Sequence, residues 1–341
     1  MMREAELYTK LPENRVRCDL CAHLCRLRPG QTGICRVRQN LEGTLYTLVA
    51  DRVVATHVDP IEKKPFYHIC PGSKSYSLAA PGCNFRCRHC QNHEISQMPS
   101  AGKPLAGRRL QPAELVRDAL AAGCRSMAYT YTEPTVYFEL MTETAALARE
   151  QGLLNLMVSN GYLTATARRR LRFLMQGANI DLKAWSDSFY RRICGAAGMT
   201  PVLETISDFV THGVWVEVTT LLIPGYNDNE SELKELARFL VSVSPSIPWH
   251  VTGFFPTYRL TGVPPTPPET LKKARDIGLA AGLHYVFEGN RPGVGGENTD
   301  CHHCGEVLIE RYGFKVVNNK ISAERCPVCQ TEVAGIFLGE C

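Results

Sequence analysis

The sequence lacks long apolar runs and any strong excess of charge of one sign. No stretch approaches the length of apolar residues that a bilayer-spanning segment needs. Residues 1–20 carry charged side chains throughout, in place of the apolar core of a secretory signal. Lysine and arginine (38 residues) exceed aspartate and glutamate (34) by only four, whereas nucleic-acid-binding proteins concentrate basic residues on one face. We therefore expect a cytoplasmic protein that acts neither in a membrane nor on nucleic acid.

Cysteine, by contrast, is abundant, with 15 residues among 341. Cysteines two or three residues apart direct their thiolates into one small volume, which suits a metal and strains a disulfide. In an intracellular enzyme, such groups indicate metal or redox chemistry. Two isolated cysteines, Cys124 and Cys194, are predicted to be small core residues. Eleven others form three groups: Cys18, Cys21, Cys25 and Cys35; Cys83, Cys87 and Cys90; and Cys301, Cys304, Cys326 and Cys329.

The chain divides into three regions. Residues 1–74 form a cysteine-rich N-terminal segment with a strand-like stretch at 44–50, and residues 297–341 form a second small cysteine module. A Gly/Pro-rich linker is predicted at 289–296. Between them, residues 75–290 alternate short apolar runs with helical patterns, which indicates a parallel α/β sheet. A doubly wound dinucleotide-binding fold would carry a G-x-G-x-x-G turn after an early strand, and the sequence has none. We therefore predict a partial (β/α)6-type TIM barrel.

The predicted elements of this barrel have clear boundaries. The strands are short and apolar, as buried parallel strands are, and several helices begin at proline and end near glycine. Catalytic groups of such folds lie at the C-terminal ends of the strands. The predicted strands are Ser75–Ala80, Ser126–Thr130, Leu154–Ser159, Ala178–Leu182, Val214–Ile223, His250–Phe254 and His284–Phe287. The predicted helices are Pro112–Ala122, Pro134–Gln151, Ala165–Met175, Pro201–Thr211, Glu230–Val241 and Pro268–Ala281.

The central cysteines form a C-x3-C-x2-C motif in the loop after the first predicted barrel strand. Cys83, Cys87 and Cys90 can bind three irons of a [4Fe–4S] cubane and leave the fourth without a protein ligand. Such an open position accepts an outside ligand, and S-adenosylmethionine offers an amino and a carboxylate group. The alternative is a structural zinc knuckle that takes His89 or His93 as its fourth ligand.

The sequence around these cysteines resembles the radical SAM superfamily over roughly residues 15–290. The resemblance is greatest to the branch of pyruvate formate-lyase-activating enzymes and, within it, to the radical SAM member of the AmmeMemoRadiSam group. It rests on several ordered motifs. These are Lys64-Pro65-Phe66-Tyr67-His68, Pro71-Gly72-Ser73, Gly82 to Asn92, Tyr131-Thr132-Glu133-Pro134, Ser159-Asn160-Gly161-Tyr162, Asp181-Leu182-Lys183 and Ile223-Pro224-Gly225-Tyr226-Asn227-Asp228.

The resemblance implies roles for individual residues. It makes Cys83, Cys87 and Cys90 the cluster ligands and places Phe85 near the adenine or the cluster. Glu133 aligns with the acidic residue of the family's Gly-Gly-Glu motif, which contacts the amino group of S-adenosylmethionine, although Tyr131-Thr132 replaces the two glycines here. The other cofactor-binding positions implied by the resemblance are Ser159, Asn160, Asp181, Lys183 and His250.

The two outer cysteine groups predict further metal sites. Cys301, Cys304, Cys326 and Cys329 have the C-x2-C-x21-C-x2-C spacing of a zinc ribbon, in which four thiolates bind one tetrahedral ion. Cys18, Cys21, Cys25 and Cys35 supply four thiolates with the spacing C-x2-C-x3-C-x9-C. Composition does not choose between zinc and a second Fe–S cluster at this N-terminal site.

The sequence is consistent with two functions. The first is a radical SAM enzyme that reductively cleaves S-adenosylmethionine and abstracts hydrogen from an unidentified substrate, for instance in the activation of a glycyl-radical protein. Its partners would be an electron donor such as flavodoxin or ferredoxin, and a protein of the AmmeMemoRadiSam group. The second is a non-enzymatic adaptor that holds zinc at all three cysteine groups and binds protein or nucleic acid. Iron–sulfur absorbance near 400 nm would distinguish the two.

Overall fold

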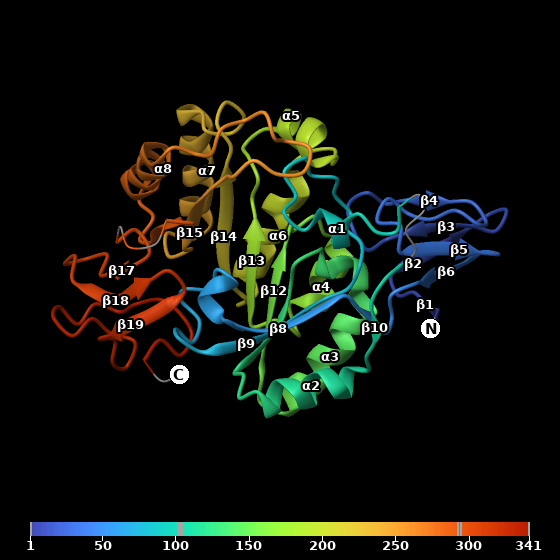
Figure 1. The fold of residues 1–341 in the computed structure, drawn as a ribbon, viewed down its shortest axis with the longest axis horizontal. Helices are drawn as coiled ribbons and strands as arrows, with labels where there is room; N and C mark the ends of the chain where they lie inside the picture. Colours follow the sequence, from blue (N-terminus) through green and yellow to red (C-terminus); the bar gives the residue numbers. More distant parts are fainter. Residues whose placement is uncertain (1, 101–104, 292, 294, 340–341) are drawn as a thin grey trace.

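One eight-stranded sheet forms the centre of the computed structural model, which describes residues 2–100, 105–291, 293 and 295–339 (Figure 1). Its strand order is β16-β15-β14-β13-β12-β11-β9-β8. The strands from β9 to β16 pair in parallel and in sequence order, and β8 pairs antiparallel with β9 at one edge. The bounds are β8 Ala55–Pro60, β9 Lys74–Ala79, β11 Ser126–Tyr129, β12 Leu154–Ser159, β13 Gly177–Asp181, β14 Trp215–Leu222, β15 Trp249–Gly253 and β16 Val286–Gly289.

This arrangement confirms the predicted α/β class and an open, partial barrel. In a doubly wound sheet the order in which strands are added reverses at a switch point. Here each new strand from β9 to β16 is added beside the previous one, always at the same edge of the sheet. Every residue of β11 is buried, as expected for a parallel strand covered on both faces. The described part of the chain has seven parallel strands, one more than the six of the predicted barrel type.

Helices connect the strands and lie on the outside of the sheet (Figure 1). In α2, Gln111 and Glu114 form a capping box beside Pro112. The helix predicted at 134–151 begins as a 3-10 turn, Pro134–Tyr137, before α3. The helix predicted to reach Met175 is shorter and ends at Leu171. The bounds are α1 His93–Ser96, α2 Pro112–Ala121, α3 Phe138–Glu150, α4 Ala165–Leu171, α5 Asp187–Phe189, α6 Thr200–Thr211, α7 Glu230–Val243 and α8 Pro268–Ala281, with a π-helical turn at Tyr190–Cys194.

The N-terminal segment forms two small antiparallel sheets beside α3 and α4 (Figure 1). It is joined to the barrel by a buried ion pair between Arg38 and Glu139 of α3 and by a hydrogen bond from Thr164 Oγ1 to the carbonyl of Asp19 (2.6 Å). The strand predicted at 44–50 ends at Thr47. The strands are β1 Arg3–Glu4, β2 Tyr8–Leu11, β3 Arg15–Cys18, β4 Arg26–Leu27, β5 Arg38–Leu41 and β6 Thr44–Thr47, while β7 Arg52–Val53 pairs with β10 Arg108–Arg109.

The C-terminal module is a three-stranded antiparallel sheet of β17 (Thr299–Asp300), β18 (Val307–Tyr312) and β19 (Lys315–Asn319). It packs against the segment after β8, because Arg311 donates to the carbonyl of Tyr67 (2.7 Å) and Ile336 N donates to the carbonyl of His68 (2.8 Å). The predicted linker at 289–296 includes residues 292 and 294, which lie outside the described residues. Among the described helices, none combines the length and apolar character needed to cross a membrane.

Candidate metal and cofactor site

A large cavity opens at the C-terminal ends of the parallel strands, where the barrel fold places its catalytic groups. It holds about 1240 Å³ of space free of protein atoms, including its solvent-open mouth. Loops after β9, β11, β12 and β13 supply most of its lining, and Thr219, Leu221 and Thr252 come from β14 and β15. Seven residues selected from the sequence meet here: Cys83, Cys87, Cys90, Glu133, Asn160, Asp181 and Lys183.

The cysteine loop that follows β9 is fixed by backbone contacts on both sides. Arg86 N and Arg88 N donate to the carbonyls of Cys194 (2.7 Å) and Ile193 (2.9 Å) in the π-helical turn. At the start of the loop, Gly82 has φ +101°, and a Cβ there would lie 2.8 Å from Val37 of the N-terminal segment. The position therefore requires glycine, and the loop is clamped between the N-terminal segment and the barrel.

The donor set of this loop fits an iron–sulfur cluster. Cys83, Cys87 and Cys90 all face the cavity, and no fourth cysteine is found among its described lining residues. His89 also lines the cavity, with its pKa lowered to about 3 by burial and by the charge of Lys183. The ligand atoms of these residues do not gather within 4.8 Å of one another, as ligands of one zinc ion would, in the described part of the chain.

Packing and hydrogen bonds around the loop fix the positions of its cysteine sulfurs. Phe85 is buried and packs edge-to-face on Tyr162, with the ring centroids 5.2 Å apart, and its backbone N–H donates to Cys83 Sγ (3.3 Å). A hydrogen bond from the Cys194 thiol lowers the pKa of Cys87. Cys194, predicted only as a core residue, therefore also contacts a candidate cluster ligand.

An ion pair projects into the cavity from the end of β13. Lys183 Nζ lies 2.6 Å from Asp181 Oδ2. Burial alone would lower the pKa of Lys183, but the charges of Asp181 and Cys87 outweigh it and raise that pKa. Asn227 fixes this loop because its Nδ2 donates to the Lys183 carbonyl (2.7 Å) while its Oδ1 accepts from Ile223 N (2.7 Å). The cavity therefore holds a permanent cation beside its thiols.

Glu133 lies at the cavity wall, almost fully buried, with 1 % of its surface exposed. It caps the 3-10 turn through Thr135 N (3.1 Å) and accepts from Ser159 Oγ (2.8 Å) and Asn160 N (2.9 Å). Burial raises its pKa, although these hydrogen bonds partly offset the rise. Asn160 Nδ2 in turn donates to Asn84 Oδ1 (2.7 Å) and so joins the wall to the cysteine loop. Ser159 acts here through Glu133 and is not among the lining residues.

His250 lies beneath the cavity and does not line it. His250 stands two residues before Thr252 on β15, on the same face of the strand, and Thr252 does line the cavity. The His250 Nε2 lies 2.6 Å from Glu217 Oε2. Glu217 also accepts from the backbone N–H groups of Tyr67 (3.0 Å) and His68 (2.9 Å). Burial alone would raise the pKa of Glu217, but His250 and these donors lower it. His250 thus belongs to a buried polar network that forms the cavity floor.

Lys64 and Tyr131 also line the cavity, and neither was predicted from the sequence as a cofactor or metal ligand. Lys64 Nζ donates a hydrogen bond to the Tyr131 hydroxyl (3.0 Å) and forms an ion pair with Asp59 Oδ2 (2.8 Å). Tyr131 has φ +68°, a conformation that favours glycine, which agrees with its standing where the resembling family has glycine. Its carbonyl accepts from Asn92 Nδ2 (3.1 Å) of the cysteine loop. The Lys64–His68 motif was the available signal for this group.

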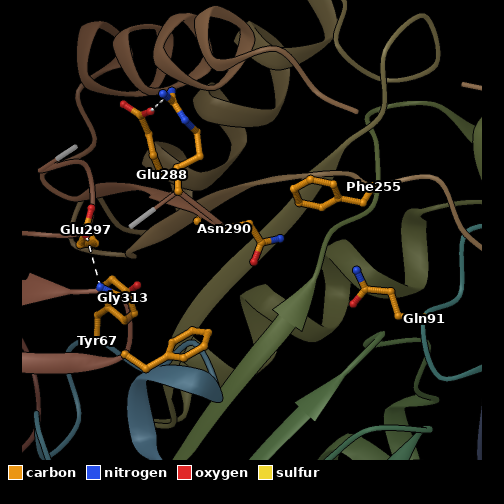
Figure 2. A pocket seen from close by; sticks show the side chains of 10 residues that line it. Tyr67, Gln91, Phe255, Glu288, Asn290, Glu297 and Gly313 are labelled. Carbon is orange, nitrogen blue, oxygen red and sulfur yellow. Dashed lines mark hydrogen bonds and ion pairs between the residues drawn. The ribbon is translucent and has the colours of Figure 1, made fainter. Parts of the chain in front are cut away.

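A second cavity adjoins the first and shares Gln91 and Asn290 with it. It holds about 780 Å³ of space free of protein atoms. Figure 2 shows Phe255 on one side and Tyr67 on the other, with Glu297 beside Gly313 of the C-terminal module and Glu288 paired with Arg291. Glu297 is buried, accepts from Gly293 N (2.7 Å), and has one oxygen without a hydrogen-bond partner. Arg291 also lines this compartment and lies 3.7 Å from Glu288, so Glu297 is the carboxylate there without a cationic partner among the lining residues.

The C-terminal cysteines converge on one point. Cys301 Sγ lies 3.6 Å from Cys329 Sγ, and Cys304 Sγ lies 3.7 Å from Cys326 Sγ. Four thiolates at the ordinary zinc–sulfur distance of about 2.3 Å stand roughly 3.8 Å apart around a tetrahedral ion. All four sulfurs lie within 4.8 Å of one another, so this group can bind a single metal ion. The N-terminal cysteines instead surround a small cavity of their own.

Comparison with known proteins agrees with this geometry. The family description "Radical SAM superfamily" matches residues 78–240. The chain is 44 % identical to the Methanocaldococcus jannaschii protein MJ0808 over 97 % of this chain and 99 % of that one. It is 22 % identical to a second protein of that organism, MJ1632, over 71 % of this chain and 87 % of the relative, whose name proposes a glycyl-radical enzyme activating enzyme.

Solved structures are also similar. A domain of a pyruvate-formate lyase-activating enzyme from Bacteroides vulgatus shares 18 % identity and a TM-score of 0.42, covering 48 % of this chain and 99 % of that domain. The family match spans the cysteine loop and the strands β11 to β14 that border the cavity. The chain therefore contains a radical SAM superfamily domain at residues 78–240.

Proposed function

We propose that this protein reductively cleaves S-adenosylmethionine and uses the resulting 5′-deoxyadenosyl radical to abstract hydrogen from a substrate. The observation that supports this most is the convergence of Cys83, Cys87 and Cys90 with Glu133, Asn160, Asp181 and Lys183 on one cavity. A [4Fe–4S] cluster on three thiolates keeps one iron open to the cofactor and supplies the electron for cleavage.

The surrounding residues would hold the cofactor in place. The Lys183 ammonium and the Asp181 carboxylate offer charged partners for its carboxylate and amino groups, in the same cavity as Glu133. Asn160 presents an amide between Glu133 and the cysteine loop. Ser159 would keep Glu133 oriented, and His250 would support the floor through Glu217 rather than touch the cofactor.

The adjoining cavity, lined by aromatic and charged side chains, is the proposed substrate compartment. Because Gln91 and Asn290 border both cavities, a substrate there would lie next to the cofactor. Arg291 offsets the charge of Glu288, so the buried Glu297 carboxylate is the charge that favours a neutral or cationic group over an anion. The name of the MJ1632 relative supports a glycyl-radical protein as one candidate substrate. A small molecule or a protein partner of the AmmeMemoRadiSam group is the other.

The cellular setting follows from the same chemistry. Thiols that ligate metals require a reducing compartment, so we propose a cytoplasmic enzyme. It would receive electrons one at a time from a low-potential donor of the flavodoxin or ferredoxin type. The convergent C-terminal tetrad is proposed to hold zinc, which has no redox chemistry and would stabilise the module.

The test uses protein purified and reconstituted without oxygen. Dithionite and S-adenosylmethionine are added, and 5′-deoxyadenosine is measured for the wild type, for Cys87→Ala and for Cys124→Ala. Cys124 is a matched control because it is a buried cysteine outside the three groups. We expect product from the wild type and Cys124→Ala and none from Cys87→Ala.

Two outcomes would contradict the proposal. Equal product from all three proteins would place cleavage elsewhere. A wild-type protein that binds zinc and no iron at Cys83, Cys87 and Cys90 would replace the enzyme with the multi-zinc adaptor considered from the sequence. A cluster without product requires the assay to be repeated with candidate substrates, since cleavage can depend on substrate binding.

A further inference from the structure

The four N-terminal cysteines line one small cavity. Its lining also includes Leu20, Gly33, Ile34 and Val136, so the cavity is mostly apolar apart from the thiols, and it holds about 340 Å³ free of protein atoms, including its opening to solvent. A Cβ placed on Gly33 would lie 3.7 Å from both Cys25 Sγ and Cys35 Sγ. The glycine therefore lets the backbone lie close to both sulfurs. The cysteines that contribute are Cys18, Cys21, Cys25 and Cys35.

The separation of the sulfurs distinguishes this site from the C-terminal one. The C-terminal sulfurs gather within 4.8 Å, the arrangement of ligands around a single ion. In the described part of the chain no three ligand atoms of the N-terminal group do so. The same is true of Cys83, Cys87 and Cys90. A cubane carries its ligands on separate irons at separate corners, so its sulfurs stand farther apart than those around one ion.

A buried cation faces the same space. Arg38 lines it and is 1 % exposed, and its Nε has no hydrogen-bond partner although the rest of its guanidinium pairs with Glu139 and the carbonyl of Glu6. An unpartnered donor at this depth costs free energy unless something in the cavity accepts from it. A group that carries negative charge on sulfur meets that need.

We propose that Cys18, Cys21, Cys25 and Cys35 bind a second [4Fe–4S] cluster, with a cysteine on each of its four irons. Because no iron stays open, this cluster does not bind S-adenosylmethionine. The assignment does not depend on the proposed reaction, since it rests on the N-terminal sulfurs, the cavity that they line and the buried Arg38.

The second cluster would touch the first loop directly. His23, between Cys21 and Cys25, has its Nε2 2.9 Å from the carbonyl of Asn84, which follows Cys83. The His23 ring packs against the Tyr162 and Phe85 pair, at centroid distances of 4.9 Å from Tyr162 and 6.4 Å from Phe85. The carbonyl of Cys35 would be 3.1 Å from a Cβ on Gly82. The two cysteine loops are thus packed as neighbours.

Metal counts on the full-length chain test the proposal. Iron, acid-labile sulfide and zinc are measured per chain after anaerobic reconstitution of the wild type, of Cys83→Ala/Cys87→Ala/Cys90→Ala and of Cys21→Ala/Cys35→Ala. Cys124→Ala is the matched control. We expect about eight irons and one zinc in the wild type and control, and about four irons and one zinc in each multiple variant.

The reduced triple variant supplies a second readout. Its electron paramagnetic resonance signal should not change when S-adenosylmethionine is added, because all four irons already have protein ligands. About four irons and two zincs in the wild type, or an iron-free triple variant with two zincs, would overturn the proposal. About two irons in the triple variant would also overturn it, in favour of a smaller cluster. If instead Cys83, Cys87 and Cys90 bind no cluster, the triple variant and wild type contain equal iron, which separates failure of the proposed function from failure here.

Discussion

Glu217→Gln should destabilise the barrel floor strongly while changing no atom of the cofactor cavity. The carboxylate accepts hydrogen bonds from Tyr67 N (3.0 Å), His68 N (2.9 Å) and Trp215 Nε1 (3.1 Å), and pairs with His250 Nε2 (2.6 Å). Glutamine keeps one acceptor oxygen and replaces the other with an NH₂ group that faces the imidazole. Hydrogen bonds to a charged group contribute about 1.5–3 kcal/mol each, so we expect a loss of about 2–4 kcal/mol.

Thermal unfolding followed by circular dichroism measures this loss. Wild type and variant are compared at equal metal content, since bound metal adds to stability. The melting temperature should fall by roughly 2–4 °C for each kcal/mol lost. Glu235→Gln, an exposed carboxylate on α7, is the control and should stay within about 0.5 kcal/mol. A loss below about 1 kcal/mol for Glu217→Gln would refute the reasoning and mean that His250 accepts from the new amide.

Three further results are expected. Arg38→Met leaves the buried Glu139 carboxylate without its cation and should cost about 3–5 kcal/mol in denaturant unfolding; a cost under 1 kcal/mol would show that the pair is not needed. Burial lowers the pKa of His68 to about 4, below the unfolded value of about 6.5. The unfolded chain therefore takes up a proton first as pH falls, and about 3 kcal/mol of stability should disappear between pH 6.5 and 4. His68→Asn should lose this part of the pH dependence of melting, and an unchanged slope would contradict it. Cys304→Ala should remove about one zinc per chain and expose the C-terminal module to proteolysis while the barrel stays intact, whereas unchanged zinc content would assign the ion elsewhere.

Local patterns predicted the strands and the cysteine loop well. The strand at Leu154–Ser159 has the predicted bounds, and β9 differs from its prediction by one residue at each end. Buried parallel strands are short continuous apolar runs, so their own side chains mark them. The edge of the sheet at which polar residues gather follows from the fold class, which is why Asp181 and Lys183 could be placed at the cavity before the structure was known.

Long-range pairings could not be predicted in this way. Residues 55–60 were assigned to the N-terminal segment, yet they form β8 at the edge of the barrel sheet. Tyr67 and His68 were noted only as part of a motif, but their backbone N–H groups reach Glu217, about 150 positions later in the chain. No local periodicity encodes a contact at that separation. For the same reason, His250 could be placed on its strand but not assigned to the floor.

The C-terminal module gives the radical SAM barrel a wall that the barrel alone does not have. Gly313 and Phe314, at the turn between β18 and β19, line the proposed substrate compartment, while the cofactor cavity is lined entirely by residues before position 291. The cysteine tetrad holds the same small module together. A fold that serves many reactions changes its substrate by changing what surrounds a fixed chemical centre. Loss of the tetrad's metal should therefore leave binding of S-adenosylmethionine unchanged and abolish turnover of the substrate, a separation that equilibrium binding and product assays on Cys304→Ala can measure.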